Sequence, residues 1–133
     1  IPFYMARTEH LLDRPDRPDR IERHLALAED RAQRQSEIGV GAWCRFLRGD
    51  MAREAGDQSE ATEHYSAARH VAEERGLKVL SMHVDLGLAR SAALRHEASA
   101  LERHRRRAAE AARAMGCTDV LGALTEFASP KDA

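Results

Sequence analysis

Apolar residues recur along this chain at spacings of three and four, which mark one face of an α-helix. Over residues 18–35 the apolar positions are Ile21, Leu25, Ala28 and Ala32, and charged residues fill most of the positions between them. No stretch alternates apolar and polar residues for long enough to form a strand. The pattern therefore predicts an all-α chain.

Proline and glycine divide the chain into seven predicted helices. Pro15 and Pro18 separate the first two, because proline lacks an N–H and clashes with the preceding turn. Gly56, Gly76 and Gly116 end later helices. The predicted helices span residues 3–13, 18–35, 38–55, 58–75, 77–95, 97–115 and 118–128, and a polar tail follows at 129–133. Connections this short make consecutive helices antiparallel.

Similar residues recur at intervals of 40 positions. The recurring residues are His24, His64 and His104, then Ala28, Ala68 and Ala108, then Ala32, Ala72 and Ala112. A fixed internal period indicates an array of helical units, each too small to bury its own apolar face. The period predicts one domain over residues 1–128, with units at about 3–36, 38–76 and 77–116 and a closing helix at 118–128.

The middle unit, over residues 42–76, resembles a tetratricopeptide repeat. Gly49 stands at the glycine of the family's first helix, and Gly56-Asp57 stands at its turn. The small, aromatic and small positions of the second helix are Ala61, Tyr65 and Ala68. The other units depart from the pattern, with Leu101 and Arg105 at the positions of Ala61 and Tyr65. The period of 40 also exceeds the family's usual value of about 34.

The resemblance implies antiparallel helix hairpins stacked as a right-handed solenoid. Units of this long kind look like those of large bacterial signalling and transcription-regulatory proteins. First helices line a concave groove in that family. The groove positions implied here, with Ala89 as the equivalent of Gly49, are Trp43, Phe46, Asp50, Arg53, His83, Leu86 and Arg90. The alternative is that Trp43 and Phe46 form core between helices.

Neither the histidines nor the arginines define a site of their own. Equivalent positions in successive units lie roughly 10 Å apart or more, because packed helices are 8–10 Å apart. One metal ion could not bridge the histidine row, since its ligands must lie about 2 Å from it. The run containing Arg103, Arg105, Arg106 and Arg107 could contact phosphates. We interpret it instead as a solvated helix face offset by nearby glutamates, so nucleic acid is not the expected partner.

Composition narrows the remaining classes. The net charge is −1, so nothing draws the whole chain to nucleic acid or to an anionic membrane. Cys44 and Cys117 lie 73 positions apart and belong to neither a CxxC nor a zinc spacing, so we expect reduced thiols and a cytoplasmic protein. No apolar stretch is long enough to span a membrane. The chain begins at Ile1 in mid-pattern, which suggests a piece of a larger protein.

No catalytic, phosphate-binding or metal motif is present in the sequence, so neither an enzyme nor a cofactor is expected. The leading expectation is a non-catalytic module that binds a protein or peptide, with Trp43 or Phe46 as anchor and Arg53 and Arg90 facing acidic groups. Self-assembly of open repeat ends is one alternative. A small-molecule sensor with a pocket between helices is another.

Overall fold

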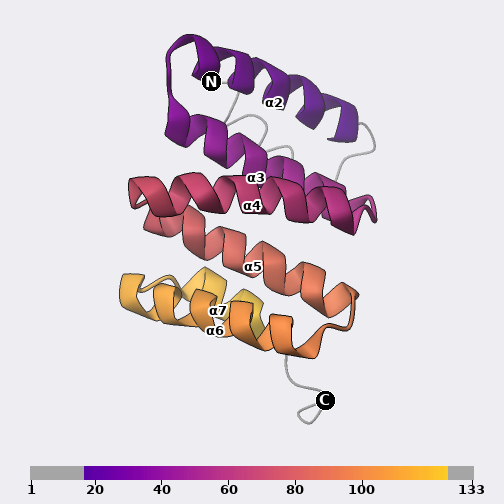
Figure 1. Ribbon diagram of the computed structural model, residues 1–133, viewed down its shortest axis with the longest axis vertical. Helices are drawn as coiled ribbons and strands as arrows, with labels where there is room; N and C mark the ends of the chain where they lie inside the picture. The colour runs from indigo at the N-terminus through magenta and orange to yellow at the C-terminus, as the bar shows by residue number, and fades with distance from the viewer. Residues whose placement is uncertain (1–16, 126–133) are drawn as a thin grey trace.

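The computed structural model describes residues 17–125, and over this range its regular structure consists of six α-helices joined by short turns, with no strand. The helices are α2 (Arg17–Arg34), α3 (Ile38–Glu54), α4 (Gln58–Arg75), α5 (Lys78–Leu94), α6 (Ala98–Met115) and α7 (Thr118–Leu124). They follow one another along the long axis, from α2 at one end to α6 and α7 at the other (Figure 1).

The predicted helix bounds agree with α2 to α6 to within one residue at each end. The last predicted helix begins at Thr118 as expected, and α7 ends at Leu124 within the described range. The predicted helix over 3–13 and the polar tail over 129–133 lie outside the described residues. None of the described helices combines the length and the apolarity that crossing a membrane requires.

Five nearly identical turns join these helices at intervals of 20 residues. Each turn contains one residue with a positive φ, and these residues are Ser36, Gly56, Gly76, His96 and Gly116. The next residue's amide donates to an alanine carbonyl five positions earlier, at 2.7–2.9 Å. This pattern is the Schellman motif, which satisfies carbonyls at a helix end. The accepting alanines are Ala32, Ala52, Ala72, Ala92 and Ala112.

The 40-residue period is therefore two helix–turn segments of 20 residues each. All five alanines are buried, because a small side chain lets the next helix pack close to the turn. The 40-residue period relates only Ala32, Ala72 and Ala112, because Ala52 and Ala92 lie in the intervening helices and recur at half the period.

Glycine at either of the two non-glycine turn positions should stabilise the protein. Ser36 and His96 have φ of 54° and 56°, a conformation that costs an L-residue roughly 1–2 kcal/mol. Glycine's larger entropy in the unfolded chain offsets part of this gain. We expect Ser36→Gly and His96→Gly each to add about 0.5–1 kcal/mol to the free energy of unfolding, measured in urea. Gly76→Ala should have the opposite sign, and an unchanged midpoint in all three variants would contradict this account.

Each helix packs against its neighbours in sequence, and some alternate helices also touch. α3 packs against α4 and α5 packs against α6, while α4 also packs against α5. The odd-numbered helices touch one another as well, α3 with α5 and α5 with α7. One core cluster contains buried side chains from α2, α3, α4 and α5, such as Leu25, Leu47 and Leu80. A second joins α5, α6 and α7 through Met82, Leu86 and Val120 among others.

Candidate functional site

Tyr65 is the side chain around which α3, α4 and α5 meet. It is fully buried, and its ring lies against Gly49 of α3 and Gly87 of α5. A Cβ atom would come within 2.7 Å of the ring at either glycine. Gly87 therefore has the packing role that the sequence analysis gave to Ala89. The other predicted packing residues, Ala61, Ala68 and Ala108, are each 0% exposed.

The hydroxyl of Tyr65 belongs to a buried polar network. It donates to Asp50 Oδ1 and accepts from Arg53 Nε at 3.1 Å. Arg53 Nη2 also lies 3.4 Å from Asp50 Oδ1. Burial and the charge of Asp50 raise the pKa of Tyr65, so its hydroxyl stays protonated and donates. Burial disfavours the charged form of Arg53, but Tyr65 and Asp50 raise its pKa on balance.

This network corrects the predicted groove. Asp50 is only 6% exposed, so its carboxylate is not offered to a partner at the surface. Arg53 is directed to the same network, with a side chain 12% exposed. The physical reason is that the tyrosine side chain on α4 is long enough for its hydroxyl to reach α3. There, a carboxylate and a guanidinium satisfy the hydroxyl and each other.

Trp43, Phe46 and His83 form an aromatic cluster between α3 and α5. Trp43 and Phe46 meet edge to face with ring centroids 5.8 Å apart. His83 lies 5.6 Å from Trp43 and 5.9 Å from Phe46 between ring centroids. Phe46 is buried, whereas Trp43 and His83 are half-buried. Trp43 therefore contributes to the core on one side and to the surface on the other.

The 40-residue period brings Trp43 and His83 side by side, because they are the same position of two successive units. Leu86 is buried. Arg90 is half-buried on α5 and forms no ion pair within residues 17–125. Of the implied groove residues, the structure thus leaves Trp43, His83 and Arg90 partly open on the α3–α5 face. We call these three the aromatic face.

Asp85 of α5 is a second buried carboxylate, and the sequence analysis missed it. It is 3% exposed. Arg69 of α4 donates to it, His104 Nδ1 of α6 lies 3.3 Å from Oδ1, and Arg107 Nε lies 3.9 Å from Oδ2. Burial alone would raise the pKa of Asp85, but the hydrogen bonds and the cationic partners lower it on balance. Its place between Val84 and Leu86 was the available signal, since a carboxylate within an apolar stripe needs a partner.

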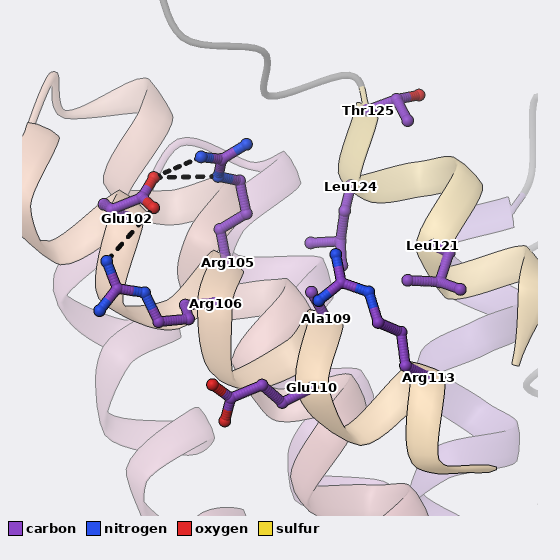
Figure 2. Close-up of a pocket in the computed structure, with 9 residues that line it drawn as sticks. All are labelled: Glu102, Arg105, Arg106, Ala109, Glu110, Arg113, Leu121, Leu124 and Thr125. Atoms are coloured by element: carbon purple, nitrogen blue, oxygen red, sulfur yellow. Dashed lines mark hydrogen bonds and ion pairs between the residues drawn. The ribbon is translucent and has the colours of Figure 1, made fainter. Parts of the chain in front are cut away.

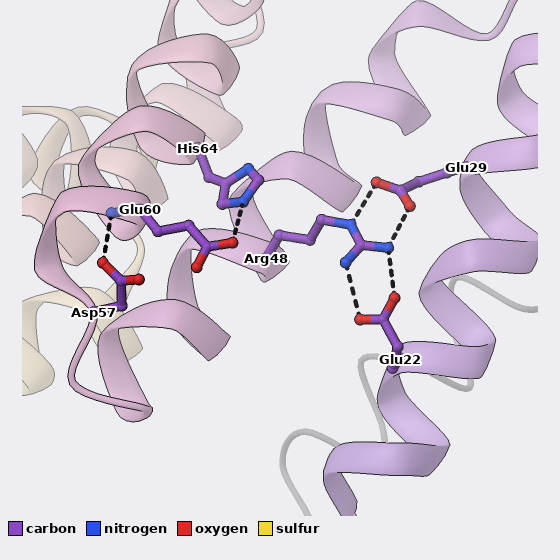
Figure 3. Close-up of polar contacts among 6 residues, drawn as sticks. All are labelled: Glu22, Glu29, Arg48, Asp57, Glu60 and His64. Carbon is purple, nitrogen blue, oxygen red and sulfur yellow. Dashed lines mark hydrogen bonds and ion pairs between the residues drawn. The ribbon is translucent and has the colours of Figure 1, made fainter.

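Arg48 joins α2 to α3. Its Nη1 and Nη2 donate to Glu22 at 2.9 and 3.0 Å, and its Nε and Nη2 donate to Glu29 at 2.7 and 2.6 Å. Figure 3 shows the guanidinium between the two carboxylates. The hydrogen bonds with Glu29 and then Glu22 raise the pKa of Arg48. Sequence alone showed only that Glu22 and Glu29 are two turns apart on one face of α2.

The histidine row does not act as a unit. His64 Nε2 lies 3.4 Å from Glu60 of its own helix (Figure 3), whereas His104 contacts Asp85 of the neighbouring helix. His24 is half-buried on α2. Among residues 17–125, no three His, Cys, Asp or Glu side chains are grouped closely enough to hold a metal ion. The row reflects the period of the fold rather than a shared site.

Glutamates and Asp85 offset most of the arginine run on α6. Arg105 Nε donates to Glu102 at 3.1 Å, and Arg106 Nη2 lies 3.7 Å from the same carboxylate. The hydrogen bond with Arg105 lowers the pKa of Glu102. Arg107 reaches Glu73 at 3.5 Å. Arg103 has no ion-pair partner in the described part of the chain, so the run does not present a continuous row of uncompensated cations.

A hollow of about 300 Å³ lies between α6 and α7. Figure 2 shows Arg105 and Arg113 on the α6 side, with Leu121 and Leu124 on the α7 side. Its charges are mixed, because Glu102 and Glu110 lie among the arginines. Three arginines and two glutamates line the hollow, and Glu102 already pairs with Arg105 and Arg106, so the lining offers no cluster of free cations for an anion.

Cys44 is fully buried between α3 and its neighbours. Burial, and to a smaller extent Glu29, raise the pKa of its thiol to about 11. A thiol with this pKa is protonated at neutral pH and is not a nucleophile. Its role is therefore that of a small apolar core residue.

Comparisons with protein-family models, with curated proteins and with solved structures found no match to this chain. The function is therefore argued from the residues and their geometry.

Proposed function

We propose that this chain is a non-catalytic helical-repeat module that binds a segment of a partner protein on the aromatic face of α3 and α5. In this proposal, the helix hairpins of the module resemble tetratricopeptide repeats and stack as a solenoid. It forms part of a larger cytoplasmic regulatory or signalling protein of bacterial type, as the resemblance implies.

The adjacency of Trp43 and His83 carries this proposal. Equivalent positions of two units meet there with ring centroids 5.6 Å apart, and both side chains are half-buried. The ring of Trp43 is partly exposed and is held in place by its contact with Phe46, so it loses little conformational entropy when a ligand covers it. Tryptophan and arginine are enriched among residues that dominate binding energies. Arg90, which has no ion pair in the described range, adds a preference for acidic groups.

Trp43 is also the chain's only tryptophan, so its fluorescence reports events on this face. A phage-displayed library of 12-residue peptides would be selected on the wild-type chain. We expect recovered peptides to shift the Trp43 emission and to bind Trp43→Ala at least tenfold more weakly, which is about 1.4 kcal/mol. Trp43→Phe should retain most of the affinity. Recovered peptides that bind wild type and Trp43→Ala equally would refute the proposal, as would a library that gives no binder.

Trp43 also packs against the core, so the folding of each variant must be measured. Far-UV circular dichroism and a urea titration of Trp43→Ala would show whether the helices remain. Arg90→Glu, a change at a half-buried side chain, provides a second test that does not remove core volume. It should weaken acidic peptides and leave neutral peptides unaffected.

A further inference from the structure

A groove with a largely apolar lining runs between α2 and α4 and has α3 as its floor. Its volume is about 560 Å³. Ile38, Gly41 and Ala42 form the apolar floor, and Ala67 and Val71 of α4 form one wall. Ile38 is 45% exposed, so the apolar lining of the groove reaches the surface. None of these residues belongs to the aromatic face.

The next repeat has a smaller concavity at a corresponding place. It lies between α5 and α6, measures about 300 Å³, and shares with the groove, 40 positions later, the lining residues Lys78, Ser81, Met82, Asp85, Arg107 and Ala111. The informative pairs are Ala42 and Met82, Arg45 and Asp85, and Ala67 and Arg107. Met82 is 2% exposed and packs with Ala108 and Ala112. Met82 therefore fills a place at which the earlier repeat has only the methyl group of Ala42, which is itself 3% exposed at the base of the groove.

The charges of the two places also differ. In the later repeat Asp85 is paired, with Arg107 Nε 3.9 Å away and Arg69 donating to it. In the earlier repeat Arg45 replaces the aspartate and Ala67 replaces Arg107. Arg45 is exposed and has no ion-pair partner within residues 17–125. The groove thus has no counterpart of the Met82 side chain or of the Asp85–Arg107 pair. Its lining carboxylates are Glu29, which pairs with Arg48, and Glu37.

We propose that the α2–α4 groove binds a segment of another protein that inserts a methionine- or leucine-sized side chain above Ala42 and places a carboxylate on Arg45. The segment supplies from outside what Met82 and the Asp85–Arg107 pair supply from within in the next repeat. An apolar anchor in a pocket with a charged neighbour is the usual arrangement of a binding hot spot. This site is separate from the aromatic face and does not depend on the function proposed for it.

Four labelled helical peptides of 16 residues would test the two chemical requirements separately. Each is alanine-based and carries fluorescein, with either two methionines or two alanines one turn apart and with either two glutamates or two lysines beside them. Fluorescence anisotropy gives the affinity, and amide NMR resonances of Gly41, Ala42 and Val71 give the location. We expect the Met/Glu peptide to bind at least tenfold more tightly than the Met/Lys and Ala/Glu peptides.

Two variants link that binding to the groove. A Cβ at Gly41 would meet no atom within 4 Å, so Gly41→Leu fills the groove without a clash and should abolish binding. Gly41→Ala is the matched control, because it adds helix propensity and leaves most of the volume open. Arg45→Glu should reverse the charge preference, so that the Met/Lys peptide binds better than the Met/Glu peptide. The indole resonance of Trp43 should not shift with the Met/Glu peptide, which separates this site from the aromatic face.

Three results would overturn the proposal. The first is the absence of shifts at Gly41, Ala42 and Val71 with millimolar Met/Glu peptide. The second is an affinity that Gly41→Leu does not change, although thermal unfolding shows that the variant is folded. The third is a sedimentation profile in which wild type self-associates and Gly41→Leu does not. That result would make a second copy of this chain the occupant.

Discussion

Gly49→Ala and Gly87→Ala should each lower the free energy of unfolding by about 1–3 kcal/mol, although alanine is the better helix former. A new Cβ at either position would lie 2.7 Å from the ring of Tyr65, which is closer than two non-bonded carbon atoms can approach. The ring cannot move aside, because a glycine packs against it from both α3 and α5 and its hydroxyl is bonded to Asp50 and Arg53. The helices must therefore separate, and core contacts are lost.

Gly41→Ala is the matched control in the same helix as Gly49. No atom lies within 4 Å of a Cβ at Gly41, so this variant should gain about 1 kcal/mol from helix propensity alone. Urea unfolding of the three variants gives the comparison directly. In a Tyr65→Leu background the Gly49→Ala penalty should shrink, since a shorter side chain leaves room. Equal effects of Gly49→Ala and Gly41→Ala would show that Tyr65 does not set the helix spacing.

The helices of this chain could be predicted from sequence because their ends depend on local signals. Gly76 and Gly116 adopt the left-handed conformation that ends a helix, and Asp57 caps α4 through the amide of Glu60 at 3.0 Å (Figure 3). These signals act within a few residues. They fix where a helix ends without any knowledge of what it packs against.

The register between helices could not be read from a fixed period. The 40-residue period makes Ala89 the equivalent of Gly49. In the structure it is Gly87 that packs against Tyr65, because this long side chain contacts α3 and α5 at different heights along the helices. Gly49 faces the Cδ1 side of the ring, whereas Gly87 faces Cζ and the hydroxyl. A two-residue offset follows from the length of one side chain.

The polar pairings were invisible for a related reason. Asp85 contacts residues 16, 19 and 22 positions away on two different helices, and Arg48 contacts residues 19 and 26 positions away. Such pairs depend on how the helices stack. The sequence could show only that a carboxylate interrupts an apolar stripe. The period therefore relates Trp43 to His83, which are 40 positions apart, but it does not give the ion pairs.

Asp85→Asn should have the largest effect among the polar substitutions, lowering the free energy of unfolding at pH 7 by about 3 kcal/mol. The carboxylate is 3% exposed and faces Arg69 from α4 and His104 and Arg107 from α6. Removing its charge leaves a mostly buried guanidinium without its counter-ion, and this loss exceeds that of an exposed pair. Asp30→Asn is the control, because Asp30 and Arg34 are both exposed and such pairs contribute about 0–1 kcal/mol.

The pH dependence of the unfolding free energy distinguishes the loss of the Asp85 charge from the loss of its packing. The pKa of Asp85 is lowered in the folded protein, so the folded state favours the ionised form. Its contribution is therefore complete above the unfolded pKa of about 3.9 and is lost as the pH falls through the folded value. The difference in unfolding free energy between wild type and Asp85→Asn should shrink as the pH falls below about 4. A difference that persists unchanged at pH 3 would mean that the packing of the side chain, not its charge, joins α4, α5 and α6.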